Sequence, residues 1–191
     1  QYQEADLLEV LVPSEQRIPP ACPVYETCGG CDFQHAAYEE QLRLKNAILG
    51  ETLCRSGLCR EEELATLLGA PLASPQPFGY RQRIRLQVAE GRAGYFSRQS
   101  HSLTPVSRCP LAGESLNSVL AGLAASKQFQ SLLNLASAIE LLENPAHNSV
   151  ILLIHYPRKT RPAEHQAAKL LCQAVPRLAA VIFSVAGQAK G

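Results

Sequence analysis

A chain of 191 residues, of which 46% are apolar and 18% charged, has the composition of an ordinary globular protein with room for one good hydrophobic core. Its longest apolar runs, 149–155 and 179–185, are far shorter than a bilayer span, and no basic-then-apolar signal peptide opens the chain. These features argue against a membrane partner and predict a cytoplasmic protein. The net charge of +1 does not decide for or against a nucleic-acid partner.

We expect the chain to be part of a longer polypeptide. It contains no methionine, so it should not begin where translation began. Leu7–Val12 is predicted to be a strand with no partner before it, and the prolines of residues 13–20 prevent regular structure after it. Residues 1–20 are therefore predicted to be a last strand followed by an extended exit.

A cysteine-rich loop and a helix are predicted next. Residues 21–34 should form a tight loop around Gly29 and Gly30, because glycine accepts positive φ angles. A helix should follow over residues 35–54, ending at Gly57, and the prolines of residues 70–79 indicate a linker or turn. The apolar stripe of this helix is formed by Tyr38, Leu42, Leu49 and Leu53.

The remaining elements arrive as two hairpins with helices between them. In residues 83–88 apolar and polar side chains alternate, which predicts a strand with one apolar and one basic face, and residues 90–93 turn the chain into a second strand over 94–98. The order then continues with a helix over 111–126, strands over 135–143 and 149–156, a helix over 162–175 and a strand over 179–185. This order predicts an α+β fold, with a mainly antiparallel sheet and flanking helices.

Positive charge is concentrated in one window. Residues 80–109 hold six arginines and one acidic residue, so this window carries about +5 and the rest of the chain about −4. A local excess of this kind is what a phosphate-binding face needs.

The seven cysteines are spaced too unevenly for a secreted disulfide scaffold. Cys22, Cys28 and Cys31 lie within ten residues, and Cys109, followed by a proline, is the best candidate for a fourth ligand. Four thiolates suit a 4Fe–4S cluster or a tetrahedral zinc site, and the presence of only one Cys-x-x-Cys pair favours the cluster. Reduced or disulfide-bonded structural cysteines are the third interpretation. Small buried side chains are expected for the others, Cys54, Cys59 and Cys172.

Several blocks of sequence occur together in one order. They are Pro13-Ser14-Glu15-Gln16-Arg17, then Cys22, Cys28 and Cys31 leading into Asp32-Phe33-Gln34-His35, then Gly79-Tyr80-Arg81-Gln82-Arg83, Gly94-Tyr95-Phe96, Ser100-His101 and Cys109-Pro110. The 77 residues between Cys31 and Cys109 also fit. In these motifs residues 13–110 resemble the bacterial 23S ribosomal RNA uracil-5-methyltransferases, the iron–sulfur branch of a family that also includes transfer RNA enzymes.

The resemblance implies a domain order. Residues 1–17 would be the remnant of an N-terminal TRAM β-barrel, residues 18–110 the iron–sulfur loop, helix and basic hairpin of a central domain, and residues 111–191 the remainder of that domain. In the family, a cysteine attacks C6 of a flipped-out uracil, and S-adenosylmethionine then methylates C5 in a C-terminal Rossmann-like domain. The sequence has no Gly-rich strand-to-helix turn, so we expect that domain to be absent and the chain to be inactive alone.

The resemblance also implies ligands and partners. Cys22, Cys28, Cys31 and Cys109 would hold a 4Fe–4S cluster with a structural role, because this methylation needs no electron. The chain would bind RNA, with 23S ribosomal RNA favoured over transfer RNA and no obligate protein partner evident. Contacts to phosphates and unpaired bases are expected from Arg81, Arg83, Arg85, Tyr80, Tyr95, Phe96 and His101. The competing interpretation puts the arginines on a solvated face and the aromatic rings in the core.

Two other functions fit parts of the sequence. One is a stand-alone iron–sulfur or zinc RNA-binding module without a methyl-transfer domain, against which the missing methionine and the abrupt ends argue. The other is a ferredoxin-type redox protein, but ferredoxins are acidic and hold their clusters with tighter cysteine runs. His35 is expected to start the helix or support the cluster rather than to bind it.

Overall fold

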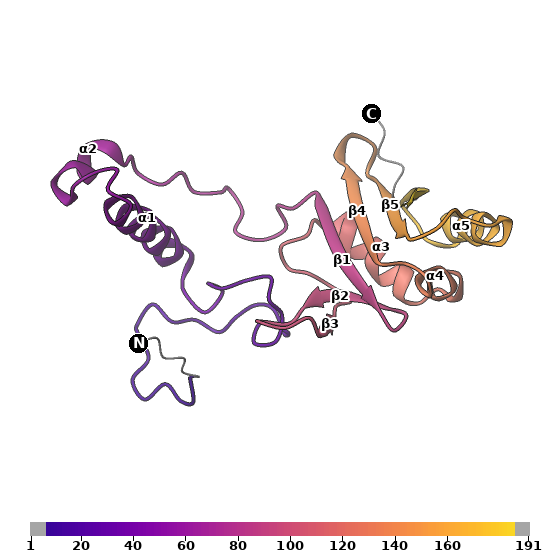
Figure 1. Cartoon of the computed structure of the whole chain (residues 1–191), viewed down its shortest axis with the longest axis horizontal. Helices are drawn as coiled ribbons and strands as arrows, with labels where there is room; N and C mark the ends of the chain where they lie inside the picture. The colour runs from indigo at the N-terminus through magenta and orange to yellow at the C-terminus, as the bar shows by residue number, and fades with distance from the viewer. Residues whose placement is uncertain (1–6, 186–191) are drawn as a thin grey trace. The chain divides into compact units, whose positions relative to one another are not determined.

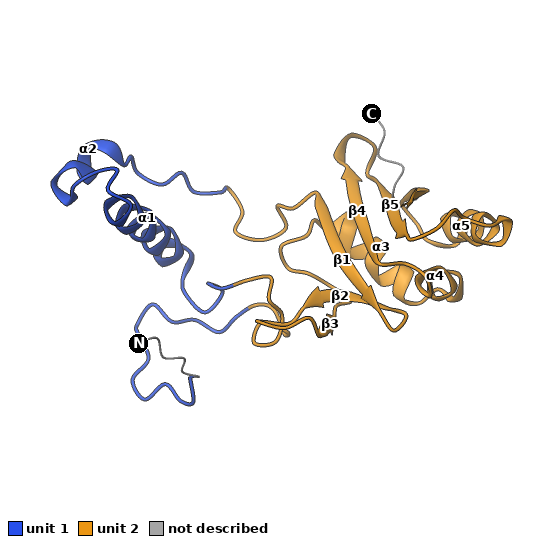
Figure 2. Ribbon diagram, in the orientation of Figure 1, with its two compact units in different colours: residues 1–20, 32–74 blue, residues 21–31, 75–191 orange. Residues whose placement is uncertain are grey.

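The computed structural model describes residues 7–185 and divides the chain into two compact units (Figure 1 and Figure 2). Unit 1 consists of residues 1–20 and 32–74, and unit 2 consists of residues 21–31 and 75–191. In sequence, residues 32–74 of unit 1 are therefore an insertion between the cysteine loop and the rest of unit 2. No helix in the described part of the chain combines the length and the apolar character needed to cross a membrane.

Unit 1 is mainly helical, and its segments are α1 (Tyr38–Arg55), the 3₁₀ turn η1 (Glu61–Glu63) and α2 (Leu64–Leu67). The helix predicted over 35–54 is confirmed as α1, and Gly57 follows its end with a φ of 74°. Gly50 is buried because α2 packs there: a Cβ on Gly50 would lie 3.2 Å from the Cδ1 atom of Leu64. Residues 70–74 have no regular structure, as expected for a linker.

The strand predicted at Leu7–Val12 is wrong. Residues 7–12 belong to no strand, and the large apolar side chains among them are exposed. A strand needs a hydrogen-bonded neighbour, and no described residue pairs with this segment. The expected β-barrel remnant over 1–17 therefore has no counterpart in residues 7–17, and residues 1–6 lie outside the described residues.

Unit 2 is built on a six-stranded sheet of order β3-β2-β1-β4-β5-β6. All neighbouring strands are antiparallel except β5 and β6, which confirms the predicted mainly antiparallel α+β fold. The strands are β1 (Arg83–Ala89), β2 (Arg92–Phe96), β3 (Leu103–Pro105), β4 (Ala138–Asn144), β5 (Ser149–Tyr156) and β6 (Leu178–Val185). The helical segments are α3 (Glu114–Ala124), α4 (Lys127–Leu133), η2 (Pro145–His147) and α5 (Pro162–Ala174).

One face of the sheet is covered by helices and holds the hydrophobic core (Figure 1). Along β5 every second side chain is buried, as strand geometry requires when only one face is packed. The fully buried Leu86, Ile139 and Leu152 meet Leu116 and Leu123 of α3 in a single apolar cluster. Burial at about 25 cal/mol per Å² of apolar surface makes this cluster the main stabilising feature of unit 2.

Three features of unit 2 were not predicted or were misplaced. The helix expected over 111–126 begins only at Glu114, because the backbone of 111–113 is used elsewhere: Arg81 N donates to Leu111 O and Gly113 N donates to Arg81 O, both at 2.9 Å. β3 and α4 are short elements that the apolar periodicity did not reveal.

Candidate metal centre and nucleic-acid interface

The cysteine loop of unit 2 is attached to the hairpin of β2 and β3 through its backbone. Gly29 N donates to Phe96 O at 2.9 Å, and Cys28 forms a β-bridge with Ser97. A Cβ atom on Gly29 would lie only 2.9 Å from Phe96 O, so this close approach requires glycine. The loop predicted from its two glycines is therefore held against the end of β2.

Arg98 strengthens the same attachment from the hairpin side. Its backbone N donates to Thr27 O at 3.1 Å, and its guanidinium donates to the backbone oxygen of Cys31. The guanidinium carbon also lies 5.3 Å from the ring centre of Tyr25, within the range of a cation–π contact. The middle and the end of the loop thus contact one arginine of residues 80–109.

Cys109 is held in place by the buried side chain of Asn117, which lies on α3. Cys109 N donates to Asn117 Oδ1 at 2.9 Å, and Asn117 Nδ2 donates to Cys109 O at 3.1 Å and to Ala112 O at 3.0 Å. Asn117 therefore satisfies three backbone groups between β3 and α3, and an amide is the only neutral side chain that both donates and accepts in this way.

The structure brings the three loop cysteines and Cys109 into one neighbourhood. Burial raises the pKa of the Cys22 thiol, a backbone hydrogen bond at Val24 partly offsets this, and negative charge on the other three thiols raises it further. Burial likewise raises the pKa of Cys28, with smaller increases from Cys31 and Cys109. All four residues belong to unit 2, so the insertion of unit 1 does not separate them.

These thiols are near one another but do not yet have the geometry of a metal site. Among residues 7–185 no three cysteine, histidine or acidic side chains are already arranged around one metal position. Binding would have to draw the sulfurs together, which the loop allows because Gly29 and Gly30 lie between two of the cysteines. His35 belongs to unit 1, whereas the four cysteines belong to unit 2.

The surroundings of the four cysteines suit a negatively charged group. Burial would lower the pKa of Arg81, but Tyr80, Tyr95 and Cys109 outweigh it and keep this guanidinium charged. The pKa of Cys28 is raised by burial, and the nearby charge of Arg98 offsets only a small part of this increase. Two cations therefore lie near thiols that would become thiolates on binding a metal.

The other two arginines of the predicted phosphate-binding stripe already have a protein partner. Glu140 of β4 is only 2% exposed, and Arg83 donates to its Oε2 through Nε at 2.8 Å and also through Nη2. Arg85 Nη1 donates to Glu140 Oε1 at 3.2 Å, and His155 Nε2 lies 2.8 Å from the same oxygen. Half or more of each arginine side chain nevertheless remains exposed.

This pairing lowers the net charge of the predicted arginine stripe and leaves its expected phosphate contacts a prediction. Burial alone would raise the pKa of Glu140, but hydrogen bonds from Arg83 and His155 outweigh it, so that pKa is lowered and the carboxylate stays charged. The cluster of Arg83, Arg85 and Glu140 then carries a net charge of about +1 instead of +2. It lies on the face of the sheet opposite the hydrophobic core.

The predicted aromatic residues are partly available. Tyr80 is 50% exposed, and the guanidinium carbon of Arg81 lies 6.0 Å from its ring centre. Phe96 is 42% exposed and meets the exposed ring of His101 edge-on, with 5.4 Å between the ring centres. Tyr95 is different, because its ring packs against the core and its hydroxyl is buried.

Sequence reasoning missed Glu140, Asn117 and Arg98. Glu140 lies in the mostly apolar strand β4. An acidic residue in a strand of this kind predicts that a cationic side chain lies beside it. The identity of that cation follows only from the pairing of Arg85 with Glu140 between β1 and β4. No sequence pattern identified Asn117, which follows Cys109 by 8 residues.

The remaining cysteines have other neighbours. Cys172 packs against the core, in agreement with its predicted role. Cys54 and Cys59 of unit 1 are half-buried, and their sulfurs lie 3.8 Å apart, which was not predicted. Burial raises the pKa of Cys54, and its contact with Cys59 raises it further.

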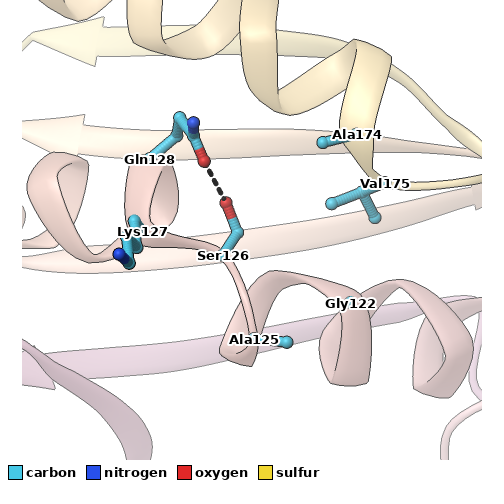
Figure 3. Close-up of a pocket in the computed structure, with 7 residues that line it drawn as sticks. All are labelled: Gly122, Ala125, Ser126, Lys127, Gln128, Ala174 and Val175. Carbon is cyan, nitrogen blue, oxygen red and sulfur yellow. Dashed lines mark hydrogen bonds between the residues drawn. The ribbon is translucent and has the colours of Figure 1, made fainter.

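A pocket of about 430 Å³ lies away from the four cysteines in unit 2 (Figure 3). Its lining comes from the end of α3, the start of α4 and the end of α5, and Ser126 is hydrogen-bonded to Gln128 at 3.0 Å across its wall. Lys127 is the one charged residue in this lining, so the pocket offers few groups for recognition or catalysis.

In sequence the chain is similar to RNA methyltransferases, although no protein-family model matches it. It is 32% identical over 179 residues to the 23S rRNA (uracil(1939)-C(5))-methyltransferase RlmD of Pectobacterium atrosepticum, a match that covers 91% of this chain and 38% of that protein. It is 35% identical over 132 residues to an uncharacterized RNA methyltransferase of Thermosynechococcus vestitus, covering 67% of this chain and 28% of that one. This chain is a relative of the RNA methyltransferases.

The fold agrees with this relationship. The structure of Pyrococcus abyssi tRNA (uracil-54, C5)-methyltransferase, determined with S-adenosyl-L-homocysteine, matches with a TM-score of 0.59 and 16% identity, covering 96% of this chain and 41% of that one. At this identity the likeness concerns the fold alone. The chain spans about two fifths or less of the length of these RNA methyltransferases.

Proposed function

We propose that this chain is the iron–sulfur and RNA-binding part of an S-adenosylmethionine-dependent RNA uracil-5-methyltransferase. The substrate would be 23S ribosomal RNA, with transfer RNA as the alternative, and methyl transfer would take place in a part of the enzyme outside this chain. The observation that supports the proposal is the electrostatic proximity of Cys22, Cys28, Cys31 and Cys109 in a chain related by sequence to a 23S rRNA methyltransferase.

The four cysteines fit a 4Fe–4S cluster by their chemistry. All four are thiols, the group that such clusters bind. Arg81 and Arg98 would offset part of the negative charge of a thiolate-bound cluster. When bound, the cluster would supply a cross-link between the loop of 21–31 and Cys109.

The protein's own residues would transmit this cross-link to the RNA-binding surface. The loop is hydrogen-bonded to Phe96, and Phe96 contacts His101, so ordering the loop also orders the exposed aromatic pair. Cys109 is tied through Asn117 to α3 and is followed by the segment that pairs with Arg81. The proposed role of the cluster is therefore structural, in the way that metal binding is linked to folding.

The cluster is tested by anaerobic purification, iron and sulfide analysis and a visible spectrum. We expect a brown protein with absorbance near 400 nm, and we expect Cys109→Ala to lose that absorbance and to melt at a lower temperature. Cys54→Ala is the matched control and should keep both, because Cys54 belongs to unit 1. A colourless protein that binds zinc, or a Cys109→Ala protein with normal stability and RNA affinity, would contradict the proposal.

RNA binding is tested with a labelled uridine-containing hairpin of 23S ribosomal RNA, compared with a transfer RNA. Arg85→Ala should weaken binding several-fold and reduce the salt dependence by about one ion equivalent, because one phosphate contact is lost. Arg55→Ala is the control, since Arg55 is also exposed, at 73% of its side chain against 52% for Arg85, but lies in unit 1 and pairs with Glu51 at 2.5 Å. Equal losses in both variants would show that the effect is non-specific charge.

A further inference from the structure

Two cysteines of unit 1, Cys54 and Cys59, are in contact with each other. Their sulfurs lie 3.8 Å apart, close enough for one thiol to donate a hydrogen bond to the other, and both residues are half-buried. The four cysteines of the candidate metal centre all belong to unit 2. The contact of Cys54 with Cys59 therefore has to be explained by unit 1 alone.

The turn that ends α1 produces this contact. Gly57 has a φ of 74°, in the left-handed region that favours glycine. Leu58 N donates to Leu53 O at 3.1 Å, and Gly57 N donates to Cys54 O at 3.0 Å. This pair of hydrogen bonds folds the chain back over the last turn of the helix, so that Cys59 returns to the side of Cys54.

The segment that follows Cys59 packs on the same face of α1. Gly50 and Cys54 are four residues apart in the helix and so share one face. A Cβ atom on Gly50 would lie 3.2 Å from Leu64 Cδ1 and 3.4 Å from Leu68 Cδ1. Since Gly50 is the only buried residue of α1, this attachment rests on few contacts, and the two thiols meet one helical turn beyond it.

We propose that Cys54 and Cys59 form a site of reversible oxidation, at which hydrogen peroxide converts the two thiols into a disulfide. The thiolate of one cysteine attacks a peroxide oxygen, the O–O bond breaks, and a sulfenic acid forms as hydroxide leaves. The other sulfur then attacks the sulfenic sulfur, so that the S–S bond forms, the S–O bond breaks and water leaves. In total the two thiols lose two electrons and two protons, and the peroxide is reduced to two molecules of water.

The geometry permits this reaction. A disulfide bond is about 2.05 Å long, so the two sulfurs have to approach by about half of their present separation. Rotation of the side chains can supply this approach because neither residue is fully buried. The two cysteines are also joined by a short turn, so the approach moves little of the chain.

The surroundings of the pair determine the rate and the kind of oxidant. Burial raises the pKa of Cys54, and Cys59, Glu61 and Glu62 raise it further. Because only the thiolate attacks, oxidation should be slow at neutral pH and should need sustained exposure. The acidic neighbours also favour a small uncharged oxidant over an anionic one such as oxidised glutathione.

The disulfide would give the segment that contains η1 and α2 a covalent attachment to α1. Its effect should be local, because unit 1 has few buried side chains and opens by losing few contacts. A cross-link at Cys54 limits that opening, since it restricts the chain on the far side of the turn. This inference does not depend on the proposed cluster or on RNA binding.

The experiment is peptide mapping of the full chain after treatment with hydrogen peroxide at mildly alkaline pH. The remaining thiols are alkylated, and the protein is digested without reduction. Trypsin cleaves after Lys45, Arg55 and Arg60, so the disulfide would join peptide 46–55 to peptide 56–60. We expect a linked pair whose mass is that of the two peptides less two hydrogen atoms, and we expect dithiothreitol to separate it.

Hydrogen exchange tests the consequence for unit 1. The amides of Leu58 and Leu68 donate to Leu53 O and Leu64 O, one on each side of η1. In the oxidised chain these two amides should exchange several-fold more slowly than in the reduced chain. Addition of dithiothreitol should restore the faster exchange.

Two variants serve as controls. Cys59→Ser should give no linked peptides, and peroxide should leave its amide exchange in unit 1 unchanged. Cys172→Ser removes another half-buried thiol, which belongs to unit 2, and should give the same linked pair as the wild-type chain.

The possible failures can be told apart. Peroxide treatment that produces only sulfinic or sulfonic acids at Cys54 and Cys59, or that links either of them to a different cysteine, would refute the site. A linked pair without slower exchange at Leu58 and Leu68 would confirm the site and refute its effect on α2. None of these results depends on iron or sulfide, so they leave the proposed function to its own tests.

Discussion

The two units of the chain differ in how they are stabilised. Unit 2 has one continuous core with fully buried side chains from the sheet and from three helices. In unit 1 the only buried residue of the 18-residue helix α1 is Gly50, and Ile48 and Leu49 are about half exposed. The apolar stripe predicted for this helix is thus real as a pattern but is only partly covered.

This difference indicates that the candidate site is held rigid by unit 2. The loop cysteines precede residues 32–74 of unit 1 in sequence and Cys109 follows them, yet all four belong to unit 2, where the sheet and α3 fix their backbone. Unit 1 relies more on local interactions, such as the ion pair of Glu40 with Arg43 at 2.6 Å. Substitutions should therefore have large effects in unit 2 and small ones in unit 1.

The largest expected effect comes from a core truncation. Leu152→Ala removes a fully buried side chain from β5, and we expect it to lower the free energy of unfolding by about 2–5 kcal/mol. Leu49→Ala is the matched change in unit 1, where the side chain is 49% exposed, and should cost less than about 1 kcal/mol. Urea unfolding followed by circular dichroism measures both, and similar losses would show that unit 1 is packed as tightly as unit 2.

A smaller effect is expected from a glycine substitution in the hairpin that supports the cysteine loop. A Cβ on Gly94 would lie 2.2 Å from Thr104 O, so Gly94→Ala must separate β2 from β3, at a cost of about 1–3 kcal/mol. Gly69→Ala in unit 1 meets nothing within 4 Å and should be neutral. Hydrogen exchange of the β2 and β3 amides would locate the damage, and unchanged protection of these amides would contradict the prediction.

The smallest of the three effects concerns the charge cluster of unit 2. Glu140→Gln should lower the free energy of unfolding at neutral pH by about 1–2 kcal/mol, because the arginines it frees are half exposed and can be solvated. The folded-state pKa of Glu140 is lowered from 4.5, so its stabilisation is fully present above that value and is lost as the pH falls through the folded-state pKa. The difference between wild-type and variant should therefore vanish on acidification.

The control for this prediction is Glu40→Gln in unit 1. The pKa of Glu40 is also lowered, through its hydrogen bond with Arg43, but Arg43 is 66% exposed and is readily solvated, so only a small change in stability is expected. A constant gap between wild-type and Glu140→Gln at all pH values would mean that Glu140 acts through packing and not through its charge.

Most of the regular structure was predictable because periodicity reports burial directly. The strand predicted from Ile84, Leu86 and Val88 is β1, and the helix that begins with Pro162 is α5. The strand predicted at Leu7–Val12 failed for the same reason: its pattern suggests a strand, but a pattern does not supply the neighbouring strand that would bind it. The short elements β3 and α4 carry too few residues for a period to be visible.

The spacing of the cysteines selects the candidate residues, but their arrangement depends on the fold. The spacing of Cys22, Cys28 and Cys31 predicts a loop in which the three thiols converge. Cys109 is the predicted fourth ligand. The arginine stripe was overestimated, because the acid that pairs with it, Glu140, is 55 residues away from Arg85 in sequence. Tyr95 is predicted to stack on a base, whereas its ring packs against the core and its hydroxyl is buried.

By itself, the sequence determined the local features of this protein: its helices and long strands, a glycine-containing cysteine loop and a basic hairpin, because each depends on neighbouring residues and on the period of their burial. Only the tertiary structure decided that the four cysteines belong to one unit despite the insertion of residues 32–74, that Glu140 neutralises part of the arginine stripe, and that the Tyr95 hydroxyl is buried. These facts depend on strand order and register, which bring distant residues together and which no local pattern specifies.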